Sequence, residues 1–187
     1  MKTADCVHTE PVPTHHRVAQ AWDRSSGRAR FAWLGATAAS VVIATDAGTP
    51  LWTTAAVGAL LATAAFVDVI ERRLPNGLLL AAGALALAGA VATGDMAVAI
   101  VGALIAGGLL LGVRLVRGLG MGDVKMAAVI GASVGPRALL AAPIAVAVAA
   151  FAAGGYGLLR TRVRLPLGPS LCLGWACALM APMGWLR

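Results

Sequence analysis

The chain has 187 residues, of which 59% are hydrophobic and only 12% are charged. A soluble domain of this length cannot bury so large an apolar share, so the composition excludes an ordinary soluble enzyme and indicates a membrane protein. The formal net charge of +7 would suggest nucleic acid in a soluble protein, but here it fits the excess of basic residues in cytoplasmic loops. We therefore expect a lipid bilayer as a partner, and no nucleic acid.

The first 30 residues are polar and end in a basic stretch. We predict that residues 1–30 form a flexible cytoplasmic tail and that residues 31–187 form a transmembrane domain. The tail contains the adjacent pair His15 and His16, but an isolated histidine pair in a polar tail is a poor metal site. The three cysteines form no CxxC motif. The sequence thus predicts no metal and no cofactor.

Apolar runs near the length of a membrane-spanning helix recur after the tail. They do not alternate as the strands of a membrane barrel would. The predicted fold is an all-α membrane protein, a polytopic bundle of about seven transmembrane helices. The fifth run is short for a full crossing, which leaves six spans as the alternative. The predicted spans are 31–47, 51–70, 78–94, 96–114, 123–135, 138–159 and 169–185.

Basic residues fix the predicted orientation of this bundle. If the N-terminus lies inside and the chain crosses seven times, every Lys and Arg except Arg137 and Arg187 falls on the cytoplasmic side. Such an asymmetry is typical of cytoplasmic loops. We therefore predict a multi-pass protein of the cell membrane with a cytoplasmic N-terminus.

Two acids fall at the same end of the predicted bundle. Asp68 lies at the end of the second span, and Asp123 follows the glycine-rich stretch 118–122. Between them the chain crosses out once and returns once, so both acids lie at the cytoplasmic end. Two close carboxylates in an apolar site share one proton, and such a pair can activate water as an aspartic protease does.

Two other interpretations of these acids remain open from spacing alone. Each acid can form its own ion pair, Asp68 with Arg72 and Asp123 with Lys125. The glycine-rich stretch can also be an ordinary turn in which Asp123 caps a helix. If the acids do form a pair, Asp68 lies near a helix C-terminus, where a negative charge is disfavoured. We therefore hypothesise that Asp68 carries the shared proton.

Three motifs resemble those of a known family. Gly120-Met121-Gly122-Asp123 reads GxGD and is followed by Val-Lys, and Asp68 precedes the run Leu74-Pro75-Asn76. Near the C-terminus, residues 165–169 read LPLGP and resemble a PxGP element. In this order, over residues 66–174, the motifs resemble those of type IV prepilin peptidases, the GxGD aspartic peptidases of bacterial membranes.

The resemblance implies an endopeptidase that removes the short leader of type IV pilin-like precursors at the cytoplasmic face of the bacterial inner membrane. It implies that Asp68 and Asp123 are catalytic. Other motif residues are implied to bind substrate or shape the site, although each also suits an ordinary loop or solvated position. These are Gly120, Gly122, Lys125, Pro75, Asn76, Pro166, Gly168 and Pro169.

The chain also departs from part of the family. Many members carry a cytoplasmic insertion with paired CxxC motifs and methylate the new N-terminus, and this chain has neither those cysteines nor that insertion. The resemblance therefore favours peptidase activity without N-methylation. The compact form resembles the peptidases of Flp/Tad-type pilus systems.

Two functions of other classes stay open. Intramembrane acids also serve small proton- or cation-coupled transporters, although no internal repeat of the kind found in transporters is evident. A non-catalytic pilus or secretion assembly subunit would use the acids only structurally. The pairs Gly108/Gly112 and Gly131/Gly135 are predicted to pack helices in any of these proteins.

Overall fold

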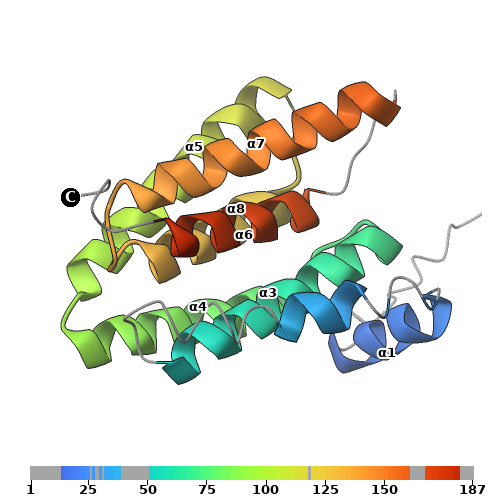
Figure 1. Cartoon of the computed structure of the whole chain (residues 1–187), viewed down its shortest axis with the longest axis horizontal. Helices are drawn as coiled ribbons and strands as arrows, with labels where there is room; N and C mark the ends of the chain where they lie inside the picture. The colour runs from blue at the N-terminus through green and yellow to red at the C-terminus, as the bar shows by residue number, and fades with distance from the viewer. Residues whose placement is uncertain are drawn as a thin grey trace, which may run out of the picture.

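The computed structural model describes residues 14–25, 27, 30, 32–38, 51–117, 119–160 and 167–181. This part of the chain is helical, with no strand, which confirms the all-α prediction (Figure 1). Residues 32–38 are helical as well. The remaining helices are α1 (Thr14–Arg24), α3 (Leu51–Glu71), α4 (Asn76–Thr93), α5 (Met96–Arg117), α6 (Met121–Val134), α7 (Ala141–Arg160) and α8 (Gly168–Met180).

Three of the helices are long and apolar enough to cross a membrane. They are Trp52–Glu71 in α3, Asn76–Thr93 in α4 and Met96–Val116 in α5. Shorter apolar helices follow at Ala141–Gly155 and Gly168–Met180. These helices confirm an all-α membrane protein, whereas the count of seven spans stays a prediction. Residues 31 and 39–47 of the first predicted span lie outside the described residues.

Helix α6 lies at the centre of the bundle. From Met126 to Val134 its residues are almost all apolar, as in a helix that is buried on all sides, and it packs against α4, α5, α7 and α8. Its 14 residues make it shorter than its neighbours. The residues buried along it are Val124, Met126, Ala127, Val129, Ile130, Gly131, Ala132 and Val134.

Glycines let α5 and α6 approach until their backbones touch. A Cβ atom on Gly131 would collide with the backbone of Gly102, and one on Gly135 would lie 2.9 Å from the carbonyl oxygen of Val98. The predicted packing role of Gly131 and Gly135 is therefore confirmed. The prediction for Gly108 and Gly112 is wrong, because both lie on the exposed face of α5 and meet no described atom within 4 Å.

The helices run alternately in opposite directions, which gives the bundle two distinct ends (Figure 1). At one end α3, α5 and α7 finish and α4, α6 and α8 begin. We call this the acid end, because Asp68 and Asp123 lie there. At the other end α4, α6 and α8 finish, and we call it the hydroxyl end after Thr53, Thr54 and Thr93.

Helix α1 lies within residues 1–30, for which the sequence predicts a flexible cytoplasmic tail. The helix packs against the acid-end half of α3, where Ala21 is fully buried beside Phe66 and Val67. Trp22 and Trp33 meet edge to face, with ring centroids 5.5 Å apart. The sequence pattern of α1 is amphipathic, and its apolar side is short enough to be overlooked in a polar stretch. Residues 1–13 lie outside the described residues.

Candidate active site

Asp68 lies in the last turn of α3 and is only 7% exposed. It is the one charged side chain that is buried in the described part of the chain. The helix ends just beyond it because Arg72 adopts a left-handed conformation (φ 53°), and the segment then turns at Pro75. The main-chain N–H of Gly168 donates a buried hydrogen bond of 3.0 Å to Asp68 Oδ2. A buried carboxylate needs such donors.

Asp123 is the third residue of α6 and is half-buried. Gly120 caps this helix with an extended backbone (φ −65°, ψ 143°), and its N–H donates to the Asp123 carboxylate. This contact is half of a capping box, in which an acid in the first turn reaches back to the amide of the capping residue. The interpretation of Asp123 as the capping residue is therefore wrong, because Gly120 is the N-cap and Asp123 contacts it from the first turn of the helix.

The turn between α3 and α4 brings α6 to Asp68. A Cβ atom on Gly122 would lie 2.8 Å from Leu74 Cβ, so only a glycine allows the start of α6 this close to the turn. Lys125 Nζ donates a hydrogen bond of 3.0 Å to Asn76 Oδ1 and ties α6 to the start of α4. With α6 held here, Asp68 lies close enough for its charge to act on the Asp123 carboxyl group.

The acids do not form the two separate ion pairs that spacing allows. No salt bridge joins Asp68 to Arg72 or Asp123 to Lys125, all four of which the structure describes. Arg72 is exposed, and Lys125 is bound to Asn76 instead. Among the described residues, the two carboxylates therefore bind main-chain amides rather than these cations.

Two helix ends lie at the Asp68 carboxylate. Asp68 belongs to the last turn of α3, and the C-terminus of a helix disfavours a negative charge. The fold adds the N-terminus of α8, which faces the Asp68 carboxylate through the Gly168 amide and favours a negative charge. Both acids thus meet a helix N-terminus, and helix ends alone no longer separate their roles.

The other predicted site residues have varied positions. Pro75 is buried and caps α4, where its missing N–H leaves no donor unpaired. Pro169 is exposed in the first turn of α8. Pro166 lies outside the described residues. Sequence reasoning did not single out Leu74 as the residue that contacts α6, nor Arg114, whose guanidinium donates to the Leu119 carbonyl at 2.9 Å and braces the loop before α6.

A comparison with protein families decides the class of the protein. The type IV leader peptidase family matches residues 55–158, more than half of the chain. The chain belongs to this family. Neither the comparison with curated proteins nor that with solved structures yields a match.

Family membership indicates a peptidase with pilin precursors as its general class of substrate. The match covers both Asp68 and Asp123 together with the turn between α3 and α4. It ends before α8, although α8 supplies the amide that contacts Asp68. A pair of acids beside a glycine-rich loop can give such a peptidase a base and an acid at one place.

Proposed function

We propose that the protein is an aspartic endopeptidase in which Asp68 and Asp123 form the catalytic pair. The observation that supports this proposal most strongly is the burial of Asp68 within electrostatic range of Asp123, in a chain of the type IV leader peptidase family. Two carboxylates so placed cannot both ionise easily and retain one proton between them. Such a pair needs neither a metal nor a cofactor to hydrolyse a peptide bond.

In the proposed reaction the ionised acid takes a proton from a water molecule, and the oxygen of that water attacks the scissile carbonyl carbon. The protonated acid donates its proton to the carbonyl oxygen, which gives a tetrahedral diol. The C–N bond then breaks as one acid protonates the amine nitrogen and the other takes a proton from a diol hydroxyl, which leaves a carboxylic acid product and one proton on the pair. Because the pair shares one proton, activity should be bell-shaped in pH, with both limbs belonging to the pair.

The proposed substrate is a type IV pilin-like precursor whose apolar helix lies in the bilayer and whose short charged leader lies in the cytoplasm. Such a substrate places its scissile bond at the membrane surface, where the acid end would lie if the basic residues face the cytoplasm. A Cβ atom on Gly120 would lie 3.0 Å from Asp123 Oδ2, so a glycine there keeps a side chain away from that carboxylate. Processing without N-methylation remains part of the proposal.

The test is co-expression of the full chain with pilin precursors encoded near it, followed by mass measurement of the mature product. The proposal expects the product to lose the mass of the leader. It expects no gain of about 14 Da, which methylation of the new N-terminus would add. The wild-type chain should cleave, and Asp123→Asn should not. A folded Asp123→Asn variant that cleaves as well as the wild type would refute the catalytic pair. Ion transport that needs both acids, without cleavage, would favour the transporter instead.

A further inference from the structure

We infer that the main-chain N–H of Gly168 is a positioning group for Asp68, so that the peptidase site extends into α8, beyond the residues that match the family. The inference rests on the proposed function, because it assigns Asp68 a part in catalysis. Its evidence is separate, since it comes from one hydrogen bond and the packing around it rather than from the motif.

The contact joins residues 100 positions apart in the sequence, and it is fully buried. Gly168 is the first residue of α8, and its amide points outward from the helix N-terminus to Asp68 Oδ2 at 3.0 Å. A main-chain donor at a helix start has no partner within its own helix. A hydrogen bond from such a donor to an ionised carboxylate is among the stronger kinds in a protein and favours the ionised form.

A side chain at this position would be crowded. A Cβ atom on Gly168 would lie 3.0 Å from the Cα of Ala65, 3.0 Å from Asp68 Oδ2 and 3.2 Å from Asp68 Cβ. One of these neighbours is backbone and the others belong to the carboxylate-bearing side chain itself, so none can rotate away without disturbing the contact. A side chain at residue 168 would therefore require the start of α8 or the Asp68 carboxylate to move by a few tenths of an ångström.

The donor is also held rigidly, which a positioning group requires. Helix α8 buries Leu171 and Trp175, and Trp175 Nε1 donates to Ser133 Oγ on α6 at 3.0 Å. Cys172 Sγ donates to the carbonyl oxygen of Leu61 on α3 at 3.3 Å. The helix is thereby fixed to both acid-bearing helices, and its first amide is fixed with it.

The first experiment compares Gly168→Ala with Gly154→Ala in the purified full chain, using a pilin precursor as substrate. Gly154 lies on α7, which packs against α8, and no described atom lies within 4 Å of its Cβ position. We expect Gly168→Ala to lower kcat by about 10- to 100-fold with little change in KM, because a misplaced acid affects the transition state more than binding. Gly154→Ala should match the wild type.

The pH dependence separates positioning from a merely structural role. Because the amide favours the ionised form of Asp68, its displacement should move at least one limb of the pH–activity profile of the pair to higher pH. A loss of folded protein would lower the amount of activity without moving either limb. An unchanged kcat in Gly168→Ala, or a lower kcat with neither limb moved, would overturn the inference.

A second measurement covers the case in which Gly168→Ala does not fold. In ¹⁵N-glycine-labelled protein the Gly168 amide should shift between wild type and Asp68→Asn, because the charge on its acceptor is lost, while the Gly154 amide should not. An unmoved Gly168 amide would overturn the inference. If Asp68→Asn cleaves like the wild type, the proposed function falls and the inference falls with it. If Asp68→Asn is inactive and Gly168→Ala is normal, the inference alone fails.

Discussion

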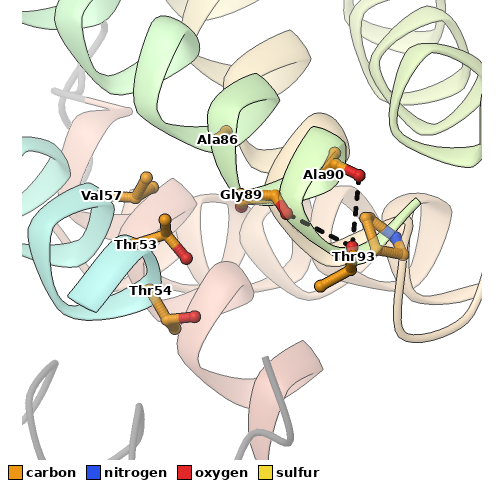
Figure 2. Close-up of a pocket in the computed structure, with 9 residues that line it drawn as sticks. Thr53, Thr54, Val57, Ala86, Gly89, Ala90 and Thr93 are labelled. Carbon is orange, nitrogen blue, oxygen red and sulfur yellow. Dashed lines mark hydrogen bonds between the residues drawn. The ribbon is translucent and has the colours of Figure 1, made fainter. Parts of the chain in front are cut away.

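The two ends of the bundle both place polar groups among apolar helices, but they do so in different ways. At the hydroxyl end a cavity of about 20 Å³ is lined by Thr53, Thr54, Thr93 and Ser133, among others (Figure 2). Thr93 Oγ1 lies 3.3 Å from the carbonyl oxygens of both Gly89 and Ala90 on its own helix (Figure 2). Neutral hydroxyl groups are satisfied by nearby carbonyls in this way at little cost.

At the acid end the polar groups are ionisable, and their contacts depend on the fold. Asp68 receives its amide from α8, and Asp123 is brought to it by the contact between Gly122 and Leu74. Burying a carboxylate is costly, whereas burying a bonded hydroxyl is not. The difference is what the proposed function expects if the acid end carries the chemistry and the hydroxyl end serves packing. Mutations at the acid end should therefore lower cleavage, whereas mutations at the hydroxyl end should lower stability.

The largest effect on cleavage should come from removing either acid. Asp68→Asn and Asp123→Asn should each lower kcat by at least about 10³-fold, because an asparagine can neither take nor give the proton. The double variant should be no worse than either single variant, since groups that act as one unit are not additive. Single-turnover kinetics would measure this. Two effects that multiply would show that the acids act independently.

A smaller effect on cleavage is expected at Gly122. The Cβ atom of Gly122→Ala would lie 2.8 Å from Leu74 Cβ, so the start of α6 must move and carry Asp123 with it. We expect kcat to fall by about 10²-fold, as a displacement on the order of 1 Å can cause. Gly112→Ala is the matched control, because its Cβ position is open among the described atoms. Equal activity of the two variants would contradict the proposed approach of α6 to the turn.

At the hydroxyl end we expect a mutation to lower stability and to leave cleavage per folded molecule unchanged. Arg137 donates to the carbonyl of Leu179 in the last turn of α8, where a cation also complements the helix dipole. Arg137→Gln should lower thermal stability by an amount equivalent to about 1–3 kcal/mol. Thermal unfolding and kcat of the folded fraction test this. A fall in kcat with unchanged stability would show that the hydroxyl end takes part in catalysis, which would contradict the comparison of the two ends.

The smallest effect is expected for Thr93→Val. Valine keeps the shape of threonine and removes only the hydroxyl bonded within α4. Thermal stability should change by about 1 kcal/mol or less, and cleavage should stay within about twofold of the wild type. Parallel unfolding and cleavage assays would measure both. A large loss of cleavage would mean that the hydroxyl end takes part in the reaction or in a motion coupled to it.

The sequence could predict the features that depend on neighbouring residues or on the number of membrane crossings. Apolar runs predicted the helices, and the count of crossings predicted that Asp68 and Asp123 share one end of the bundle. Gly131 and Gly135 were predicted to pack because a small residue every fourth position marks one helix face. The same pattern failed for Gly108 and Gly112, since spacing does not say which face of α5 meets a neighbour.

Contacts between distant segments could not be predicted. The PxGP resemblance singled out Gly168, but only the packing of α8 on α3 shows that its amide reaches Asp68. The hypothesis that Asp68 carries the shared proton stays a prediction, because the sequence indicates one helix end at this carboxylate and the fold adds a second. Helix α1 was missed because its short apolar side is surrounded by polar residues.

The most direct test of the central claim is an infrared titration of the protonated carboxyl band in the wild-type chain, Asp68→Asn and Asp123→Asn. If the two acids interact, each like charge makes the other keep its proton to higher pH. The account predicts that the band persists to higher pH in the wild type than in either single variant. If the band disappears at the same pH in a single variant as in the wild type, the account is contradicted, because the two acids would then not form a pair.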